Sequence, residues 1–427
     1  MKLSAENPPA PKDVLLAMFH AAVRAAAPEN IVAHLPSAPT GRVLVLGAGK
    51  ASAAMAAAVE RAWPSVEMSG LVVTRYGHGA ACERIEVVEA GHPVPDAQGQ
   101  RAAERMLELA RAAGPDDLVL ALISGGGSSL LVKPAPGLSL DDKREVTRQL
   151  LACGATIQEL NCVRKHLSGI KGGRLALAAA PAKVLTFVIS DVPGDDPSMV
   201  ASGPTLGDTT TSTQALAIVD RYRLNVPESV RRHLTGALVS PCTLDALASR
   251  CAIVAHPQMS LDAAAAAARA LGAEPIILGD DIQGEAREVA ASMARMTLDH
   301  VRSPGGRSSR RVFLSGGETT VTVRAPGRGG RNSEFLLALT IALGSTPGIS
   351  AIACDTDGID GSEDNAGAVM DPSSLRRAAE LGLDPQEFLF ENDSYSLFQA
   401  LGDLVTTGPT RTNVNDFRAI LVEIDPS

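Results

Sequence analysis

The stretch Arg42-Val-Leu-Val-Leu-Gly-Ala-Gly-Lys-Ala-Ser52 decides the fold of this chain. Its apolar run from Val43 to Leu46 is unbroken, which is typical of a strand buried on both faces of a parallel sheet. Gly47 and Gly49 predict a tight turn, and the Ala-rich sequence from there to about Trp63 predicts a helix. Strand, glycine turn and helix in this order form the first half of a βαβ unit.

The same alternation continues along the chain. In its first part we expect strands at 71–74, 85–89, 118–123 and 184–189, and helices at 13–27 (with Asp13 as a possible cap), 98–113, 140–155 and 171–180. A polar, Thr-rich and Pro-punctuated region at 207–250 separates this part from a second α/β block. There we expect strands at 252–255, 275–278, 312–314, 319–324 and 350–354, and helices at 261–271, 282–301 and 333–343.

These patterns predict an α/β protein of two α/β domains, whose largely parallel or mixed sheets are covered by helices. Residues 1–245 would form a Rossmann-like N-terminal domain and residues 246–427 a second α/β domain, with the boundary near residue 245. A length of 427 residues suits two or three domains.

Composition excludes several classes of protein. The chain is 45% hydrophobic but only 3% aromatic, so intrinsic disorder and base-stacking nucleic-acid modules are both disfavoured. The net charge of −9 provides no electrostatic footprint for nucleic acid or an anionic membrane. No apolar run is long enough for a membrane span, and the N-terminus lacks the apolar core of a signal peptide. Six cysteines without CxxC spacing indicate free thiols in a reducing compartment, so we expect a cytoplasmic protein.

Lys50 stands out because the chain has only eight lysines, none of them beyond Lys183. The turn that carries it, Gly47 to Ser52, is an incomplete dinucleotide fingerprint, because Ser52 takes the place of the last Gly or Ala. It is also no Walker A motif, because Leu44 stands where the first Gly belongs. A lysine at a helix N-terminus behind a glycine turn is nevertheless a good anion site, although a bland turn with a solvated lysine remains the alternative.

Two further glycine loops follow predicted strands. The first is Ser124-Gly-Gly-Gly-Ser-Ser129, whose backbone N–H groups and hydroxyls suit a phosphate. The second is Ser315-Gly-Gly-Glu318, which repeats the Ser-Gly-Gly pattern. It leads toward Arg331, placed just before a predicted helix, where it could bind a carboxylate or phosphate. A plain flexible turn is the alternative for the first of these loops.

Two acidic loops also follow predicted strands. One runs from Ser190 to Asp196 and includes Asp191; the other runs from Cys354 to Asn365 and includes Asp355 and Asp357. Carboxylates at strand ends could hold Mg²⁺ or act as a general base. The second loop is not an EF-hand, because Ile359 and Asp360 break that pattern. Solvated acidic turns are the alternative reading.

Taken together, these segments resemble the glycerate 2-kinases. The resemblance runs from about residue 13 to 425 and rests on ordered motifs: LVLGAGKASAAM, GHPVPDAQG, LISGGGSSLL, ELNCVRKHLSGIKGGRLA, ISDVPGDDPSMVASGPT, LSGGETTVTV, GGRNSEFLLAL, CDTDGIDGSEDNAGA and TGPTRTNVNDF. Members of this family join an N-terminal α/β domain to a MOFRL domain, here at about 310–420, and are often labelled hydroxypyruvate reductases. One departure is Arg411, where the family pattern leads us to expect Gly.

The resemblance implies ATP- and Mg²⁺-dependent phosphorylation of D-glycerate to 2-phosphoglycerate in a cleft between the two domains. Lys50, Arg331 and Asp191 then match catalytic positions. The implied nucleotide-binding residues are Gly47, Gly49, Ser124, Gly125, Gly126, Gly127, Ser128, Ser129, Gly316, Gly317 and Glu318, and the implied metal ligands are Asp191, Asp355 and Asp357. The sequence does not decide which carboxylate is the base. We expect D-glycerate and ATP as the only partners, apart from a homodimer assumed on general grounds.

Two other functions stay open from the residues themselves. An NAD(P)H-dependent hydroxypyruvate reductase would need a complete fingerprint and a ribose-binding carboxylate, yet the relevant strand ends in Thr74-Arg75. A sugar-acid-sensing regulatory protein would explain an anion site but not the acidic loops.

Overall fold

The computed structural model describes residues 9–39, 41–192, 194–236, 249–302 and 309–424, which divide into two compact units. One unit comprises Pro28–Val254, and the other combines Met1–Ala27 with Ala255–Ser427. The helix that opens the described chain, α1 (Pro11–Ala25), therefore belongs to the unit of the C-terminal half. The predicted N-terminal domain of 1–245 included this helix, and the predicted boundary near residue 245 lies outside the described residues.

The unit of residues 28–254 contains a six-stranded sheet in the order β3-β2-β1-β4-β5-β6. Every strand pair from β3 to β5 is parallel, as the continuous apolar runs predicted. The strands are β1 (Val43–Ala48), β2 (Met68–Arg75), β3 (Ile85–Ala90), β4 (Leu118–Ser124), β5 (Lys183–Ile189) and β6 (Ser249–Ala255).

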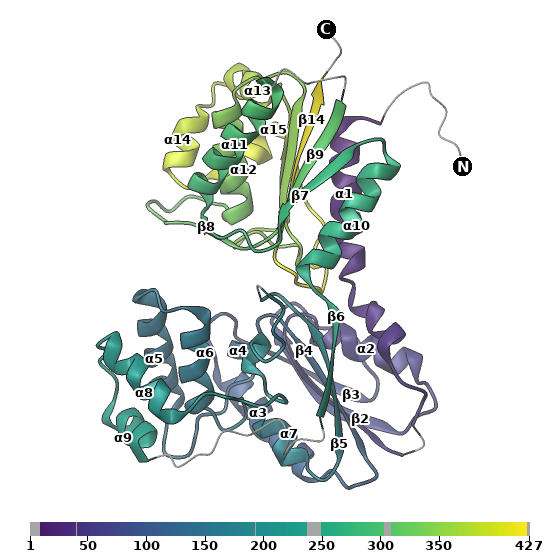
Figure 1. Cartoon of the computed structure of the whole chain (residues 1–427), viewed down its shortest axis with the longest axis vertical. Coiled ribbons are helices and arrows are strands. Elements are labelled where there is room, and N and C mark those ends of the chain that lie inside the picture. The colour runs from purple at the N-terminus through teal and green to yellow at the C-terminus, as the bar shows by residue number, and fades with distance from the viewer. Residues whose placement is uncertain (1–8, 40, 193, 237–248, 303–308, 425–427) are drawn as a thin grey trace. The chain divides into compact units, whose positions relative to one another are not determined.

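Helices cover this sheet and extend beyond it (Figure 1). Apolar residues of the strands, α3 and α7 form one continuous core. A separate apolar cluster lies among α5, α6, α8 and α9. The helices are α2 (Ser52–Ala62), α3 (Ala97–Arg111), the single turn α4 (Gly127–Leu130), α5 (Leu140–Ala152), α6 (Ile157–His166), α7 (Arg174–Ala179), α8 (Ser212–Arg221) and α9 (Glu228–Gly236). Helices α6, α8 and α9 were not predicted from the sequence.

The other unit has a mixed six-stranded sheet in the order β13-β12-β11-β14-β9-β7. Strand β7 pairs in parallel with β9, and the remaining pairs are antiparallel. The strands are β7 (Glu274–Gly279), β9 (Ser309–Ser315), β11 (Ile349–Asp355), β12 (Gly367–Met370), β13 (Leu404–Val405) and β14 (Asp416–Ile424).

Both faces of this second sheet are buried. Helices α1 and α10 (Pro257–Ala270) pack on one face, and the Ser260 hydroxyl donates to the Ala22 carbonyl at 2.9 Å. On the other face lie α11 (Ala286–Arg302) and α12 (Arg331–Leu343), followed by α13 (Ser374–Glu380), α14 (Pro385–Phe390) and α15 (Ser394–Leu401) (Figure 1). The α/β class and the two α/β domains predicted from the sequence are confirmed.

Several predicted element ends were wrong. Helix α1 begins at Pro11 after the N-cap Ala10, so Asp13 lies in the first turn and is not the cap. The strand expected at 319–324 is only β10 (Thr319–Thr320), because it pairs with the two-residue β8 (Gly284–Glu285). That pairing also delays the start of α11 to Ala286, although the sequence predicted a helix from Ile282.

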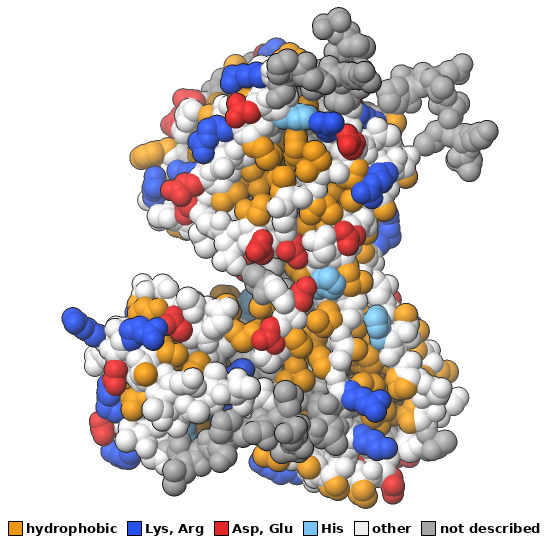
Figure 2. Space-filling view, viewed as in Figure 1, with side chains coloured by type: hydrophobic (Ala, Val, Ile, Leu, Met, Phe, Trp, Pro, Cys, Tyr) orange, Lys and Arg blue, Asp and Glu red, His pale blue; other side chains and the backbone are white. Residues whose placement is uncertain are grey.

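Two surface properties bear on partners. No helix in the described part of the chain is both long and apolar enough to cross a bilayer. On the described part of the face in Figure 2, Lys and Arg side chains lie scattered among acidic and neutral ones.

The described cysteines, Cys82, Cys153, Cys162, Cys251 and Cys354, are free thiols, and Cys242 lies outside the described residues.

Candidate active site

Three of the predicted loops meet at the carboxyl edge of the parallel sheet. The register pairs Ala48 at the end of β1 with Ile123 of β4, and Ser124 with Ile189 at the end of β5. The loops after these strands therefore start side by side, at the edge where open α/β sheets bind ligands.

The first two loops are interlocked by hydrogen bonds. The Lys50 N–H donates to the Gly125 carbonyl at 2.9 Å, and the Ala51 N–H donates to Ser124 Oγ at 3.0 Å. Lys50 is therefore attached through its backbone to the glycine loop that was predicted to cradle phosphates.

The glycines of the first loop are required by this close approach. A Cβ on Gly47 would lie 2.5 Å from the Leu122 carbonyl oxygen, and one on Gly49 (φ +139°) would collide with Ser124. Both glycines thus let the turn lie against β4 and its loop. Ser52, in the third fingerprint position, donates its hydroxyl to the same Leu122 carbonyl at 2.9 Å.

Gly126 lies between the side chains of His92 and Lys50. Its φ is +78°, and a Cβ there would be 3.0 Å from His92 Nε2 and 3.3 Å from Lys50 Cγ. The imidazole of His92, a residue for which we expect a structural or hydrogen-bonding role, lies against the glycine loop. Two groups suited to anionic ligands thus flank the middle of this loop.

Lys171 supports the same loop from inside and was missed in the sequence analysis. Its ammonium is buried and donates to the Ser128 carbonyl (2.8 Å), Ser128 Oγ (3.3 Å) and the Ala201 carbonyl (3.2 Å). Burial lowers the pKa of Lys171 well below its ordinary value, and the charges of Lys143 and Arg164 lower it further. Two features of the sequence could have pointed to Lys171. Lysine is rare in this chain, and Lys171 lies in the KHLSGIKGGRLA motif.

A strained turn completes this region. Ala201, Ser202 and Gly203 have φ values of +51°, +60° and +56°, a region that residues other than glycine rarely adopt. In this conformation the buried Ser202 hydroxyl lies 2.8 Å from Ser128 Oγ and donates to Asn161 Oδ1 at 2.7 Å. Backbone strain is thus offset by hydrogen bonds to the glycine loop.

Strand β5 ends at Ile189, and Asp191 comes two residues later, directly after Ser190. Asp191 is half-buried. Since the ends of β4 and β5 are paired, it starts from the same sheet edge as Ser124. The structure therefore brings Lys50, Ser124–Ser129 and Asp191 to one edge of one sheet.

In the other unit, Arg331 is the centre of a charge network. Its Nε donates to Asp416 (2.7 Å), Nη1 to Glu318 (2.5 Å) and Nη2 to Asp355 (2.8 Å). Burial by itself lowers the pKa of Arg331, but the charges of Asp416, Asp355 and Glu318 outweigh it and raise the pKa well above its ordinary value. Arg331 therefore stays charged and fixed.

A second buried arginine, also missed, continues this network. Arg418 donates through Nη2 to Asp416 Oδ2 and through Nη1 to the Gly316 carbonyl, at 2.5 and 3.0 Å. Burial lowers the pKa of Arg418, although Asp416 acts in the opposite direction. Asp416 thus bridges two arginines, and its place in the TNVNDF motif was the only signal in the sequence.

Asp360 anchors the start of α12. Its carboxylate accepts the backbone N–H groups of Asn332 (2.9 Å) and Ser333 (2.8 Å). Burial raises the pKa of Asp360, while these hydrogen bonds lower it in part. The contact fixes the residue that precedes Asn332, which is Arg331.

The loop Ser315–Glu318 lies against the protein's own backbone. The Gly316 N–H donates to the Gly279 carbonyl at 2.9 Å, and the Gly317 carbonyl accepts from the Asp416 N–H at 3.0 Å. Gly317 has φ +102° and leaves no room for a Cβ beside the backbone of Ile282. Its observed contacts thus hold the charge network together.

The carboxylates predicted as metal ligands lie in separate units, Asp191 in one and Asp355 and Asp357 in the other. Asp355 Oδ1 accepts from the Asp357 N–H at 3.0 Å while Oδ2 accepts from Arg331. Within the described residues, no three His, Cys, Asp or Glu side chains converge as a metal site. Such a donor set fits Mg²⁺ brought in by a nucleotide, because that ion needs only one or two carboxylates beside phosphates and water.

Comparisons with known proteins find relatives that match most of the chain. A family model described as "Domain of unknown function (DUF4147)" matches residues 14–235, and one described as "MOFRL family" matches residues 311–416. A protein of Agrobacterium vitis named "Putative hydroxypyruvate reductase" is 55% identical over 96% of this chain and 94% of its own length. The "D-glycerate 2-kinase" of Thermotoga maritima is 37% identical over 96% of this chain and 98% of its own length.

Two solved structures also resemble this protein over nearly its whole length. The crystal structure of glycerate kinase from Thermotoga maritima superposes with a TM-score of 0.84 at 36% identity, covering 96% of this chain and 99% of that one. A structure from Pyrococcus horikoshii superposes with a TM-score of 0.80 at 35% identity, covering 97% and 99%. These likenesses extend over both units, and the chain belongs to the MOFRL-containing glycerate kinase family.

Proposed function

We propose that this protein is a glycerate 2-kinase that transfers the γ-phosphoryl group of ATP to the 2-hydroxyl of D-glycerate. The observation that carries the proposal is the hydrogen bond from the Lys50 backbone to the Ser124–Ser129 loop, with His92 and Lys171 beside the same loop. Phosphoryl transfer demands mainly positioned cations and N–H donors around the phosphates, and this sheet edge supplies both.

The residues would divide the work as follows. Lys50 and Arg331 would neutralise charge on the transferred group, and the N–H groups and hydroxyls of Ser124–Ser129 would bind phosphate oxygens. The 2-hydroxyl oxygen of glycerate would attack the γ-phosphorus while the bond from that phosphorus to the β,γ-bridging oxygen breaks, so that ADP leaves and a carboxylate accepts the hydroxyl proton. Asp191 is our candidate for that base, because it starts from the same sheet edge as Lys50.

Asp355 and Asp357 would hold the Mg²⁺ of the nucleotide, while Asp191, the third carboxylate predicted as a metal ligand, is assigned here to the role of base. When bound, that ion neutralises phosphate charge in the transition state. For Gly316, Gly317 and Glu318, nucleotide contact stays a prediction; their observed contacts position Arg331 and Arg418.

Hydroxypyruvate reductase is the second candidate, because the 55% identical relative carries that name. Two observations weigh against it. First, a dinucleotide site needs a ribose-binding carboxylate at the end of the second strand, but β2 ends in Thr74-Arg75. The Thr74 hydroxyl donates to the Lys50 carbonyl at 3.3 Å. Ser52 occupies the third fingerprint position and is hydrogen-bonded within the protein.

A paired assay tests the proposal. Purified protein is incubated with ATP, Mg²⁺ and either D- or L-glycerate, and products are followed by ³¹P NMR, which separates 2- from 3-phosphoglycerate. In parallel, hydroxypyruvate is offered with NADH or NADPH and absorbance is recorded. We expect ADP and 2-phosphoglycerate from D-glycerate alone; nicotinamide oxidation without any ADP formation would establish the reductase instead.

The cytoplasmic location and the homodimer stay predictions. Light scattering on the purified protein measures the second directly, and a mass near 44.1 kDa would show a monomer.

A further inference from the structure

Ser128 of the glycine loop belongs to a chain of buried polar side chains that reaches helix α6. Lys171 Nζ lies 3.3 Å from Ser128 Oγ, which in turn lies 2.8 Å from Ser202 Oγ. Ser202 Oγ continues the chain to Asn161 Oδ1 at 2.7 Å. Lys171, Ser202 and Asn161 are each at most 2% exposed. The chain thus joins the loop to three side chains that lie far from it in the sequence.

The direction of these hydrogen bonds is set at Asn161. Its Nδ2 donates to the Met199 carbonyl at 3.3 Å, so Oδ1 is the atom that faces Ser202 and accepts its proton. A hydroxyl has a single proton, so Ser202 can only accept in its contact with Ser128. Ser128 therefore donates to Ser202 and accepts from Lys171. Each hydroxyl in the chain has one orientation.

The ammonium of Lys171 also joins the loop directly to the turn at 201–203. Besides Ser128 Oγ, it contacts the Ser128 carbonyl at 2.8 Å and the Ala201 carbonyl at 3.2 Å, and it donates to both. These three hydrogen bonds use the three protons of an ammonium group. Within the described parts of the chain, no carboxylate forms an ion pair with Lys171. Its polar partners are therefore the loop and the turn.

Backbone hydrogen bonds pair the segment after Lys171 with the same turn. The Gly172 N–H donates to the Ser202 carbonyl at 3.1 Å, and the Gly173 N–H donates to the Gly203 carbonyl at 2.8 Å. The Lys171 side chain thus crosses to the loop from a segment that is itself attached to the turn, so loop, turn and segment support one another.

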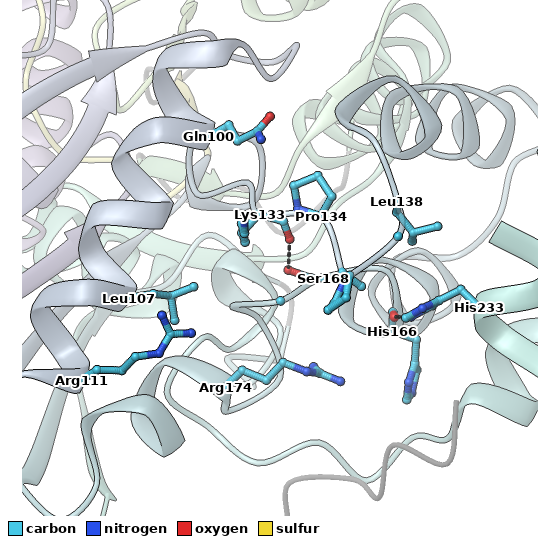
Figure 3. Close-up of a pocket in the computed structure, with 14 residues that line it drawn as sticks. Gln100, Leu107, Arg111, Lys133, Pro134, Leu138, His166, Ser168, Arg174 and His233 are labelled. Atoms are coloured by element: carbon cyan, nitrogen blue, oxygen red, sulfur yellow. Dashed lines mark hydrogen bonds between the residues drawn. The ribbon is translucent and has the colours of Figure 1, made fainter. Parts of the chain in front are cut away.

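The backbone of Lys171 is anchored at the wall of a cavity of about 560 Å³ (Figure 3). Ser168 Oγ accepts from the Lys171 N–H at 3.3 Å and donates to the Lys133 carbonyl at 3.2 Å, the second bond being drawn in Figure 3. On the other side, Arg174 Nη1 donates to the Lys171 carbonyl at 2.7 Å. Both peptide groups of Lys171 are therefore fixed, and its long side chain starts from a rigid base.

We propose that Lys171, Ser202 and Asn161 are positioning residues of the proposed kinase, which hold Ser128 and hence the glycine loop in the shape that binds the nucleotide's phosphates. This inference rests on the proposed function, because it assigns the loop to phosphate. A glycine-rich loop needs such supports, since glycines do not hold one backbone conformation by themselves. Buried side chains with paired polar groups suit this role, because each partner is costly to leave unpaired.

Hydrogen exchange in the absence of ligands tests the support without catalysis. We expect exchange of the segment 125–131 to be about tenfold faster in Lys171→Met than in the wild type, because the loop loses its main attachment. Lys143→Met is the matched control. It removes another buried lysine of the same unit, which donates to the Leu167 carbonyl at 2.9 Å and not to the loop. Exchange of 125–131 in this control should equal that of the wild type.

The far end of the chain is tested at Asn161, which is hydrogen-bonded to Ser202 and Met199 but not to the loop. Asn161→Leu removes the acceptor of the Ser202 proton at similar side-chain size, so exchange of 125–131 should rise about threefold. Gln158→Leu, an amide-to-leucine change at an exposed position of the same helix, should leave exchange unchanged. Since Ser202 and Asn161 act through one chain, Ser202→Ala combined with Asn161→Leu should accelerate exchange no more than the stronger single variant.

Kinetics then separate positioning from a general loss of stability. With D-glycerate as acceptor, Lys171→Met and Asn161→Leu should raise the KM for ATP about fivefold and leave the KM for D-glycerate unchanged, because only the phosphate loop is displaced. A merely destabilised protein would instead lose kcat with both KM values unchanged.

Wild-type exchange of 125–131 in Lys171→Met, or equal acceleration in Lys143→Met, would overturn the proposal. Should Lys171→Met fail to fold, unchanged exchange in both Asn161→Leu and Ser202→Ala would overturn it. If the wild type transfers no phosphoryl group from ATP to glycerate, the proposed function fails, while the exchange data still decide whether the chain supports the loop.

Discussion

The loops Ser124–Ser129 and Ser315–Glu318 have the same Ser-Gly-Gly start after a buried strand, yet their surroundings are opposite. The first lies among Lys50, His92 and Lys171. The second lies among carboxylates and the arginines that neutralise them, with Glu318 itself bound to Arg331. A glycine loop is thus a permissive backbone, and the side chains from elsewhere in the chain decide what it holds.

The difference extends to the glycines themselves. Gly126 is bordered by side-chain atoms of His92 and Lys50, which are able to move, whereas Gly317 is bordered by the backbone of Ile282. We therefore expect the first loop to respond to substitution through activity, and the second through stability.

The largest effect should come from Arg331→Met. The substitution leaves the buried carboxylates of Asp416 and Asp355 without their shared cation, so we expect a loss of about 3–5 kcal/mol in the free energy of unfolding, measured by urea denaturation. The control is Arg376→Met, which removes an exposed pair with Glu380 and should cost less than about 1 kcal/mol. Equal urea midpoints for the two variants would contradict a structural role for the charge network around Arg331.

Lys50→Ala should separate activity from stability at the site beside the first loop, to which the Lys50 backbone is hydrogen-bonded. We expect kcat to fall by about 10²–10³-fold, since one positioned charge on the transferred group is lost, while the urea midpoint stays unchanged. Lys183→Ala, at the exposed start of β5, is the matched control and should retain full activity. Wild-type turnover in Lys50→Ala would remove this lysine from the site.

Alanine at the two loop glycines makes the comparison direct. Gly317→Ala should cost about 3 kcal/mol, because φ is +102° and its Cβ meets fixed backbone. Gly126→Ala should cost about 1 kcal/mol for its φ of +78° and reduce turnover more than stability, because its Cβ displaces Lys50 and His92. Thermal unfolding and kinase assays on both variants measure this; a reversed ranking of stabilities would break the comparison.

A pH series tests how far burial lowers the pKa of Lys143. The pKa of Lys143 is about 7 in the folded protein and 10.5 in an unfolded chain, so between these values the unfolded state binds the extra proton and stability rises with pH. From pH 7 to 9 the wild type should gain about 2 kcal/mol relative to Lys143→Met. Parallel pH profiles for the two proteins would show that Lys143 titrates normally.

The smallest change in stability should come from Arg411→Gly. Arg411 has φ +61°, which accounts for the Gly expected there from the family pattern. We expect the variant to be about 0.5–1 kcal/mol more stable, measured as a rise in Tm, because the strain exceeds the added chain entropy. Arg411→Ala keeps the Cβ and should gain nothing; an equal gain in both variants would locate the effect in the lost side chain.

The local parts of this structure were readable from the sequence. Periodicity predicted most strands and the major helices, and glycine turns after strands predicted where Lys50 and Ser124–Ser129 lie. Such signals depend on neighbouring residues, so they survive without knowledge of the fold. The short helices α8 and α9 were missed because the polar composition of residues 207–250 outweighed their apolar residues at helical spacing, such as Ala215, Ile218 and Val219.

Contacts between distant residues were not readable. Asp416 reaches Arg331 across 85 positions and Lys171 reaches Ser128 across 43, and no local pattern encodes either approach. The placement of α1 with the C-terminal half, through its packing on α10, has the same cause.

The sequence by itself determined the α/β class, the family and the loops that carry the chemistry, because burial patterns and glycine turns are local properties of the chain. Only the tertiary structure decided that one Ser-Gly-Gly loop lies beside lysine and histidine side chains, whereas the other lies within a carboxylate–arginine network. The physical reason is that charge acts through space: a loop's electrostatic environment is set by the side chains that folding brings to it.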